Sequence, residues 1–336
     1  MEILKNFSLK HLNTFGIDAK AAEFCVVTSL SDLNTLWENK YFEKNHLILG
    51  GGSNVLLKND FDGLVVHIDF PGLETSTQSS ETFITAGAGI FWNDLVLHAV
   101  EQNLGGVENL RLIPGKVGAA PIQNIGAYGV ELKDIFHSLK AYNLTNGQEE
   151  QFDVDKCQFG YRESVFKGKS KGKYVITEVV LKLMTNPTLN TSYGAIENEL
   201  EKRKINNPTI KDISDVVADI RVSKLPDPIT IGNGGSFFKN PIVTKSERDR
   251  VIAKFPDLVS YEVKGEYKLA AGWLIEQCGW KGKHVGNTGT WKNQALVLVN
   301  HGGATGSEIF NFSSDIIASV ESKFGVQLER EINVIG

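Results

Sequence analysis

The sequence lacks several features that would assign it to common classes of protein. Its 336 residues carry a formal net charge of −5 and no block of Lys and Arg, which argues against nucleic acid as the main partner. The longest apolar runs have only the length of strands, so we expect no transmembrane helix and no membrane insertion. The opening residues, MEILK, lack the pattern of a signal peptide, which predicts a cytoplasmic protein.

Cysteine and histidine are too few and too scattered to indicate a redox or metal site. Cys25, Cys157 and Cys278 are isolated thiols without C-x-x-C spacing, which is typical of buried structural cysteines in a reducing compartment. The histidines show no spacing such as H-E-x-x-H, so we expect no metal site. The G-x-G-x-x-G motif of Rossmann dinucleotide sites and the G-x-S-x-G motif of hydrolases are also missing.

Length and composition indicate a globular protein with more than one domain. The chain exceeds the size of one ordinary domain, and 41% hydrophobic with 22% charged residues is typical of globular proteins. Changes in pattern along the chain predict three α+β parts, over residues 1–70, 71–211 and 212–336. The last residues of the chain are a candidate to return to the first part.

Apolar periodicity and turn residues predict the order of helices and strands. Ser31 is expected to cap a helix over residues 31–42, and Thr244 with Glu247 forms a capping box that predicts another. Further helices are expected over residues 91–102, 212–221, 269–277 and 314–324. Strands are expected over residues 46–49, 55–57, 64–66, 82–86, 174–184, 295–300 and 328–335. The Asn-Gly pair at residues 146–147 predicts a hairpin.

A stretch of small residues from Ile113 to Gly129, IPGKVGAAPIQNIGAYG, is the most unusual segment of the chain. It is too poor in bulky side chains to build a core and too apolar to be a disordered linker. Glycine lets a backbone pass close to a ligand, and Gln123 and Asn124 add amide donors and acceptors. The stretch therefore indicates backbone wrapped around a large cofactor. A tightly packed turn between two elements is the alternative.

A second glycine-rich turn, GGGSN at residues 50–54, lies between two predicted strands. Successive backbone N–H groups in such a turn form a nest that suits a pyrophosphate. A plain turn is the alternative, and the absence of a directly following helix disfavours a Rossmann site. Two separate phosphate-sized cradles together suggest one long ligand, such as a flavin dinucleotide, held between two domains.

Two further segments carry side chains suited to catalysis. The sequence GYRES places Arg162 among polar residues, and an arginine can bind a carboxylate through two parallel hydrogen bonds. An ion pair with Glu163 is the alternative. Three glycines at residues 232–235 lead to Ser236, which lies next to two phenylalanines. Such a serine can donate its proton to a strongly basic carbon, or it can simply hold a turn.

Other candidate residues have plain individual explanations. Glu331 stands in the predicted last strand, where a carboxylate is usually a solvated surface group. Tyr193 follows loop residues and is as readily a packing side chain. Lys224, Lys239 and Gln294 form no recognisable motif when each is taken alone. Their value as candidates depends on the other segments.

Taken together, the motifs resemble those of the UDP-N-acetylenolpyruvoylglucosamine reductase family, flavoenzymes of bacterial peptidoglycan precursor synthesis. The matching segments follow the family's order over nearly the whole chain, at residues 13–16 (NTFG), 49–54, 113–129, 160–164, 232–241 and 269–276. Tyr193-Gly194 and the sequence KLPDP at residues 224–228 indicate the subtype with a substrate-covering tyrosine loop. The chain departs from many relatives at Gly234, where they have alanine or another small residue, and at Arg330, where they have proline.

The resemblance implies an α+β fold whose flavin-binding part is of the vanillyl-alcohol-oxidase/p-cresol-methylhydroxylase type. Residues 1–70 and 71–211 would form its two FAD-binding subdomains, and residues 212–336 a C-terminal substrate domain. It implies noncovalently bound FAD and NADPH as the reductant. The implied substrate is the UDP-linked enolpyruvyl sugar UDP-N-acetyl-3-O-(1-carboxyvinyl)glucosamine, which is reduced to UDP-N-acetylmuramate. We expect the protein to be a monomer.

The resemblance also implies roles for individual residues. Arg162 and Glu331 would polarise the substrate carboxylate, and Ser236 would protonate the α-carbon after hydride transfer to the β-carbon. Substrate contacts are implied for Tyr193, Lys224, Asn240 and Gln294. Cofactor contacts are expected from Gly50, Gly51, Gly52, Ser53, Asn54, Pro114, Gly115, Gly118, Ala119, Gln123, Asn124, Gly126, Ala127 and Tyr128.

Two other functions stay open on the sequence. A flavin oxidoreductase with a different substrate would share the fold, although the serine motif and the C-terminal glutamate argue against it. A nucleotide-sugar binding or transfer protein without redox activity would explain the two glycine-rich segments and the tyrosine loop, and it would be colourless.

Overall fold

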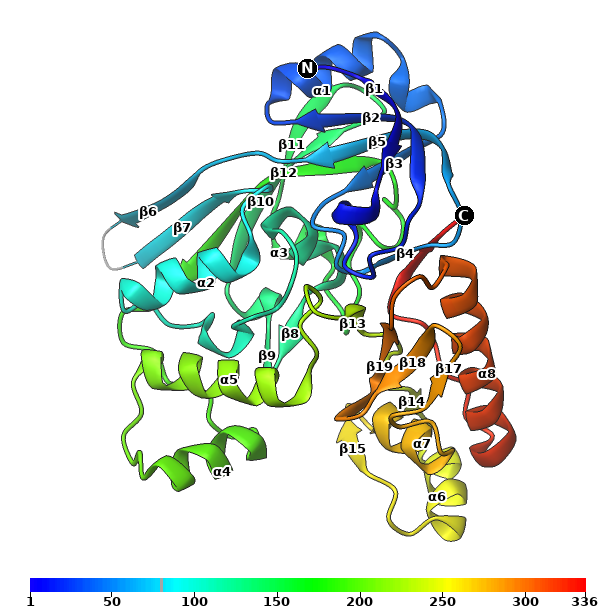
Figure 1. Ribbon diagram of the computed structural model, residues 1–336. Coiled ribbons are helices and arrows are strands. Elements are labelled where there is room, and N and C mark those ends of the chain that lie inside the picture. Colours follow the sequence, from blue (N-terminus) through cyan, green and yellow to red (C-terminus); the bar gives the residue numbers. More distant parts are fainter. Residues whose placement is uncertain (79–80) are drawn as a thin grey trace. The chain divides into compact units, whose positions relative to one another are not determined.

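The computed structural model describes residues 1–78 and 81–336, whose contacts group them into two compact units (Figure 1). The first unit consists of Met1–Phe7, Ala21–Gly51 and Asp62–Arg221. The second unit consists of Ser8–Lys20, Gly52–Phe61 and Val222–Gly336. The two units divide the first 70 residues into alternating pieces. The three predicted parts with boundaries at residues 70 and 211 therefore stay a prediction.

Two β-sheets dominate the described part of the first unit. The smaller sheet has the order β1-β2-β5-β3, with bounds Leu4–Ser8, Lys20–Val27, Phe61–Ile68 and His46–Leu49. The larger, antiparallel sheet has the order β11-β10-β12-β7-β6, with bounds Gln148–Phe152, Phe136–Asn143, Tyr174–Leu183, Glu81–Gly87 and Leu73–Gln78. Helices α1 (Leu30–Glu38) and α2 (Trp92–Glu101) each bury an apolar face in a hydrophobic cluster beside these sheets.

Most predicted elements of this unit are present, with some shifted ends. The strand over residues 46–49, the helix over 91–102 and the strand over 174–184 are confirmed to within one residue. The predicted cap at Ser31 is wrong. Helix α1 begins at Leu30 because Ser29, two residues before Ser31, forms a reciprocal capping box with Asp32. The Asn-Gly hairpin is confirmed as β10 and β11, which pair antiparallel across it.

Helices α4 (Gly194–Arg203) and α5 (Ile210–Lys224) pack on each other through a hydrophobic cluster of their own. Ile196 and Leu200 of α4 are buried with a face of α5 that includes Ile213 and Val217. Helix α5 confirms the periodicity over residues 212–221. Helix α4 is absent from the sequence prediction, because its first residues have loop composition and its few apolar residues give only two positions at helical spacing.

Within the described residues, the second unit has one four-stranded sheet and two smaller ones. The larger sheet has the order β13-β19-β18-β17, with bounds Gly232–Ser236, Gln294–Asn300, Thr288–Trp291 and His284–Val285. The three-stranded sheet has the order β14-β16-β15, with bounds Ile242–Val243, Glu266–Leu269 and Ser260–Val263. In the third, β20 (Asn333–Ile335) lies parallel to β4 (Val55–Leu57), so the end of the chain returns to an N-terminal segment.

Three helices complete the described part of the second unit, namely α6 (Lys245–Lys254), α7 (Ala271–Gln277) and α8 (Gly306–Phe324). The capping box of Thr244 and Glu247 is confirmed. Helix α8 begins before the predicted Ser314, because Thr305 and Glu308 form another capping box. The predicted strand over residues 328–335 is wrong in its first part, since β20 begins only at Asn333. Both α7 and α8 pack against β19.

The buried Asn13 shapes the NTFG loop of the second unit. Its amide nitrogen donates to the carbonyls of Leu9 and Ile17, at 2.8 and 3.0 Å, and its oxygen accepts the Ile17 N–H at 2.9 Å. One side chain therefore satisfies three backbone groups of a tight loop. Such a loop could not be buried without these hydrogen bonds.

The same loop joins distant segments of the second unit. The Thr14 N–H donates to the Gly52 carbonyl at 3.1 Å, and the Thr14 carbonyl accepts the Asn233 N–H at 2.9 Å. The Phe15 carbonyl accepts the side-chain amide of Asn300 at 2.9 Å. The NTFG motif thus connects the second glycine-rich turn to β13 and β19.

A buried lysine attaches the small-residue stretch of the first unit to β5. The Lys116 side chain is 5% exposed, and its ammonium group donates to the Asp69 carboxylate at 2.7 Å and to the Ile68 carbonyl at 3.1 Å. The same group lies 3.0 Å from Nε2 of His67. Burial and the positive charge of Lys116 lower the pKa of His67. The neutral imidazole is therefore the form that this contact favours.

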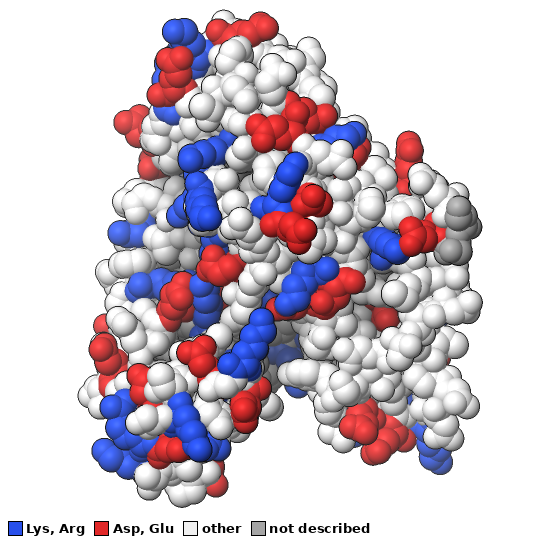
Figure 2. All heavy atoms as spheres, turned by 180° about the vertical axis from the view of Figure 1, so that it is seen from behind, with Lys and Arg blue, Asp and Glu red and all other residues white. Residues whose placement is uncertain are grey.

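The cysteine thiols of the chain are buried or half-buried. Cys25 and Cys157 are buried, and burial raises their thiol pKa values to about 11 and about 12, whereas Cys278 is only half-buried. Among residues 1–78 and 81–336, no group of three or more His, Cys, Asp or Glu could hold a metal ion. The helices described in these ranges are too short or too polar to cross a membrane. Figure 2 shows acidic and basic side chains interspersed on one face.

We expect Asn13→Ala to lower the free energy of unfolding by about 2 kcal/mol, because the buried Ile17 N–H loses its acceptor and two carbonyls each lose a donor. Urea unfolding followed by tryptophan fluorescence measures this loss. The matched control is Asn39→Ala, whose amide also bonds a backbone carbonyl, at 2.8 Å, but on the exposed surface. The control should change stability by less than about 0.5 kcal/mol. Equal losses in the two variants would contradict the assignment.

We expect the protein to lose stability as the pH falls below about 6.5, partly through His67. Its pKa is lowered in the folded protein, so the unfolded chain binds the proton more readily, and acidification favours unfolding. His67→Gln should therefore flatten the decline in the urea midpoint between pH 7 and pH 5. The exposed His11→Gln serves as the control and should keep the wild-type slope. An unchanged slope in His67→Gln would refute this assignment.

Candidate active site

Two glycine-rich segments of the first unit meet just after β3. A Cβ atom built on Gly51 would lie 3.0 Å from Cα of Gly115, and one on Gly50 would lie 3.6 Å from Cβ of Ala119. Backbone therefore touches backbone, and a side chain at Gly51 would displace its neighbour. Pro114 and Ala119 are exposed, and Gly50 and Gly115 are half-exposed. This accessible floor of small residues fits a large nucleotide cofactor.

The small-residue stretch adopts an unusual backbone. Its centre is a 3-10 helix over Val117–Gln123, and Asn124 and Tyr128 follow with φ of +44° and +49°. A left-handed tyrosine is uncommon and is tolerated only where the surroundings hold it. A Cβ atom on Gly118 would lie 2.5 Å from Cβ of Ala88, so internal packing also requires glycine here. Close packing and the accessible floor thus occur in the same stretch.

Asn124 joins the small-residue stretch to the GYRES loop. It is fully buried, and its Nδ2 donates to the Gly160 carbonyl at 3.0 Å and to the Glu131 carboxylate at 3.2 Å. Its Oδ1 accepts the Lys133 N–H at 3.0 Å. The amide is therefore used within the protein, and a direct contact with a cofactor stays a prediction for this side chain.

Arg162 rests directly on the small-residue stretch. Its Nη2 donates to the Gly126 carbonyl at 2.7 Å, and the residue itself has a left-handed φ of +55°. Two residues on, the Ser164 hydroxyl donates to the Ile122 carbonyl at 2.6 Å. The GYRES loop is thus fixed at both ends to the predicted cofactor segment. This fixation gives the guanidinium group a defined position.

Ser236 is exposed at the end of β13, while the two residues after it are buried. Phe237 and Phe238 are at most 1% exposed and pack edge-to-face at 5.2 Å between ring centroids. They anchor the strand in the core and do not enclose the serine. Gly234 is required before it, because a Cβ atom there would lie 2.6 Å from the ring of Phe15. The serine hydroxyl is therefore presented at the surface of a rigid segment.

Glu331 lies on a segment that pairs with the residues after Ser236. Its N–H donates to the Phe237 carbonyl at 2.8 Å, and the Lys239 N–H donates to the Glu329 carbonyl at 2.9 Å. The two segments run antiparallel around an isolated bridge. The predicted strand placement of Glu331 is corrected to this irregular pairing. Ser236 and Glu331 are neighbours through it although they are far apart in the sequence.

Tyr193 precedes α4 and contacts the small-residue stretch. Its ring packs edge-to-face on Tyr128 at 5.2 Å between centroids. Arg221 hydrogen-bonds Tyr128, and burial lowers the pKa of this guanidinium group. The side chain of Asn109 donates to the carbonyls of Tyr128 and Asn190, at 3.0 and 2.9 Å. The predicted tyrosine loop is thus attached to the predicted cofactor segment within the first unit.

In the second unit, the side chains of Asn240 and Gln294 lie beside the first turn of α7. The Asn240 side-chain oxygen accepts the Ala271 N–H at 2.9 Å, and a Cβ atom on Gly272 would lie 3.0 Å from the Gln294 amide oxygen. The Asn293 side-chain amide donates to the Ser223 carbonyl at 2.9 Å, and this bond joins the chain next to Gln294 to the chain next to Lys224. The three predicted substrate residues of this unit therefore belong to neighbouring segments.

The second glycine-rich turn continues into the second unit at Gly52. A Cβ atom on Gly52 would lie 1.9 Å from the Leu12 carbonyl oxygen, so only glycine fits. Ser53 is half-buried, and the Asn54 carbonyl accepts both the backbone and the side-chain N–H of Asn333, at 3.0 and 3.1 Å. This turn thus leads from the floor of small residues to β20.

Two charged residues beside the site are absent from the sequence predictions. Lys116 stands inside the small-residue stretch, and Arg221 hydrogen-bonds Tyr128. Both left a signal in the sequence. Lys116 is the single charge in an apolar, glycine-rich run, and Arg221 stands four residues after the core position Val217 on one helix face. A charge within an apolar pattern is worth treating as a candidate.

Comparisons with known proteins match the chain over its whole length. A model of an FAD binding domain matches residues 22–153, and a model of the UDP-N-acetylenolpyruvoylglucosamine reductase C-terminal domain matches residues 227–335. Proteins named UDP-N-acetylenolpyruvoylglucosamine reductase are 51% identical in Flavobacterium johnsoniae and 45% identical in Amoebophilus asiaticus, each covering 100% of both chains. The protein of that name from Pseudomonas aeruginosa is 44% identical over 99% of both chains.

Solved structures share the fold. A UDP-N-acetylenolpyruvylglucosamine reductase from Thermus caldophilus aligns with a TM-score of 0.68 at 24% identity, over 100% of this chain and 98% of that one. A p-cresol methylhydroxylase aligns with a TM-score of 0.51 at 9% identity, over 96% of this chain and 83% of that one. These similarities confirm the predicted α+β fold with its flavin-binding part. With relatives of up to 51% identity over its full length, the chain belongs to the UDP-N-acetylenolpyruvoylglucosamine reductase family.

Proposed function

We propose that this chain catalyses the NADPH-dependent reduction of UDP-N-acetyl-3-O-(1-carboxyvinyl)glucosamine to UDP-N-acetylmuramate, with noncovalently bound FAD. The 51% identity over the full length of a UDP-N-acetylenolpyruvoylglucosamine reductase carries this proposal. The match of an FAD binding domain to residues 22–153, which include both glycine-rich segments, supports the cofactor. Bound FAD supplies hydride chemistry, which amino-acid side chains cannot perform.

The floor of small residues is the proposed place for FAD. The backbone at residues 50–54 and 114–116 would meet its diphosphate, since glycine-rich backbone approaches a ligand without side chains in the way. The N–H groups of residues 117–119 already donate to protein carbonyls, so Gly118 and Ala119 would contribute only contact surface. The segment from Gln123 to Tyr128 would border the rest of the cofactor. Lys116 would not contact FAD, but its hydrogen bonds to Ile68 and Asp69 would hold this backbone against the end of β5.

Arg162 is the proposed partner of the substrate carboxylate. Reduction of the enolpyruvyl group places negative charge on its α-carbon and carboxylate. A fixed guanidinium group aimed at developing charge stabilises it by roughly 3–4 kcal/mol. The hydrogen bond from Nη2 to the Gly126 carbonyl fixes one nitrogen of the guanidinium group. Because this group is planar and rigid, the direction of its other N–H groups is fixed as well. Glu331 is proposed to act with Arg162 in orienting the carboxylate.

Ser236 is the proposed proton donor. Serine is a weak acid, but an enolate carbon is basic enough to take its proton. The exposure of Ser236 on a strand anchored by Phe237 and Phe238 supports this role. In this step the O–H bond of serine breaks, a C–H bond forms at the α-carbon, and solvent returns a proton to the serine oxygen.

The UDP-sugar is proposed to contact Tyr193, Lys224, Asn240 and Gln294. Tyr193 is 48% exposed and Lys224 is exposed, so both are available to a ligand. The Asn240 amide oxygen accepts the Ala271 N–H of α7, and the Gln294 amide oxygen accepts the Leu296 N–H of β19 at 3.3 Å. The NH₂ groups of both side chains are the candidate donors to the substrate. A cytoplasmic monomer remains part of the proposal.

The function is tested with an anaerobic visible spectrum of the purified protein supplied with FAD. We expect a flavin band that bleaches with NADPH and returns when the UDP-linked enolpyruvyl sugar is added. A band that bleaches and does not return would keep the flavin fold and refute the substrate. A protein that holds no flavin would favour a nucleotide-sugar binding protein without redox activity.

Ser236→Ala should leave reduction of the flavin by NADPH nearly intact and slow reoxidation by the sugar by at least about 10²-fold, because only the second half-reaction needs the proton donor. Stopped-flow absorbance separates the two half-reactions. Ser246→Ala, at an exposed position in α6 of the same unit, is the control and should match the wild type. Equal slowing of both half-reactions in Ser236→Ala would contradict the role.

A further inference from the structure

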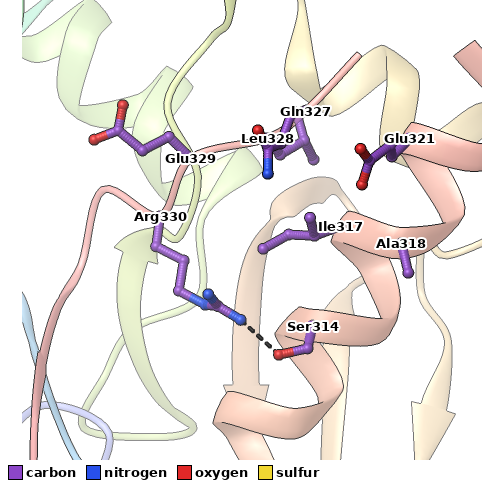
Figure 3. A pocket seen from close by; sticks show the side chains of 8 residues that line it. All are labelled: Ser314, Ile317, Ala318, Glu321, Gln327, Leu328, Glu329 and Arg330. Atoms are coloured by element: carbon purple, nitrogen blue, oxygen red, sulfur yellow. Dashed lines mark hydrogen bonds between the residues drawn. The ribbon is translucent and has the colours of Figure 1, made fainter. Parts of the chain in front are cut away.

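The backbone that carries Glu331 is an irregular segment supported on one side by the residues after Ser236. Behind it lies an open cavity of about 760 Å³ between this segment and α8, whose lining includes Ile317, Glu321 and Leu328 (Figure 3). Leu328 and Ile332 are buried on either side of this stretch, whereas Glu329 and Arg330 border the open space. At Arg330 itself, the position of the segment therefore depends on discrete hydrogen bonds.

Arg330 provides such contacts. Its Nε donates to the Ser313 hydroxyl at 2.8 Å and its Nη2 donates to the Ser314 hydroxyl at 2.6 Å. The guanidinium group lies 4.3 Å from the ring centroid of Phe310. Both serine hydroxyls donate in turn to the Phe310 carbonyl, at 2.6 and 3.1 Å, so their oxygens are oriented to accept.

The neighbouring residues tie the segment from its other side. The Glu329 carboxylate accepts from the ammonium group of Lys239 at 2.6 Å, in addition to the backbone bonds described above. Figure 3 shows Arg330 extending toward Ser314 while Glu329 points away from it, as expected for consecutive residues of extended chain. Arg330 thus reaches α8 from one face of the segment, and the bonds to residues 237–239 hold the other.

We propose that Arg330 is a positioning residue, which holds the segment between α8 and the strand of Ser236 so that Glu331 keeps its catalytic orientation. The role rests on the function proposed for Glu331. Arg330 precedes Glu331 directly and its side chain ends at α8, so it acts through the backbone and not on the substrate. A displacement of about 1 Å in a catalytic group can cost up to about 10²-fold in rate, which gives this anchor its importance.

Arg330→Ala should lower kcat for reduction of the UDP-linked enolpyruvyl sugar about tenfold, while KM for the sugar and the rate of flavin reduction by NADPH stay within about twofold of wild type. Arg330→Lys, which can reach one hydroxyl but lacks the planar fork, should lie between Ala and wild type. The double variant Ser313→Ala/Ser314→Ala should also lower kcat. Adding it to Arg330→Ala should lower kcat little further, because both changes break one interaction.

Arg248→Ala is the matched control. Arg248 belongs to the same unit, approaches the Ser260 hydroxyl at 3.5 Å and lies 4.8 Å from the ring centroid of Tyr267, but it is not adjacent to a proposed catalytic residue. It should keep the wild-type kcat. All rates are measured per bound flavin on protein with an intact thermal transition, so loss of folded protein does not enter.

A wild-type kcat in Arg330→Ala, or equal losses in both half-reactions, would overturn the positioning role and leave the proposed function standing. Additive losses in the combined variant would overturn the role of the two serines. A wild-type protein whose reduced flavin is not reoxidised by the sugar would refute the proposed function and the role of Arg330 with it.

Discussion

The close approach of backbone segments around Phe15 is the constraint on which the second unit depends. Cβ atoms on Gly232 and Gly234 would lie 2.2 Å from the Phe15 carbonyl oxygen and 2.6 Å from its ring. The neighbouring hydrogen bonds of Thr14 reach β13 and the turn at Gly52. Because the two glycines of β13 leave room for the backbone and the ring of Phe15, β13 packs directly against this residue. This packing fixes where β13 ends, and so it fixes the position of the exposed Ser236.

The first unit uses the same principle for its glycine-rich segments. Gly51 and Gly115 bring two backbones into contact, and a buried lysine beside Gly115 ties one of them to β5. The GYRES loop then builds on this base through Asn124 and Arg162. A catalytic arginine of the proposed reaction is thereby held by the same stretch that is proposed to hold the cofactor. The same small-residue stretch therefore positions Arg162 and forms the proposed FAD site.

The charged groups near the proposed site are held by matched hydrogen bonds. Arg330 meets two oriented serine hydroxyls, and Lys116 meets a carboxylate and a carbonyl. A partly desolvated cation is costly unless such partners surround it, and the pKa of Arg330 is lowered by burial. The arrangement stabilises one geometry of the backbone near Glu331. It explains how an irregular segment next to a cavity can carry a group that needs a defined orientation.

Much of the local structure could be predicted from the sequence. Helix α5 followed from its apolar period, the β10–β11 hairpin from Asn-Gly, and the start of α6 from a capping box. The cap of α1 was misplaced by two residues, because Ser29 and Ser31 are both acceptable caps and only the position of Asp32 decides between them. Helix α4 escaped prediction because packing on α5, and not its own pattern, stabilises it.

The sequence by itself determined the family, since its motifs recur in one order, and it marked the candidate residues, since glycine-rich runs and isolated charges are visible as composition. Only the tertiary structure decided how those residues act. It showed that Asn124 faces the protein interior and that the phenylalanines after Ser236 anchor the strand. It also showed that Glu331 pairs with the strand of Ser236. These are contacts between residues far apart in the chain, and no local pattern encodes which distant backbone will satisfy a given hydrogen bond.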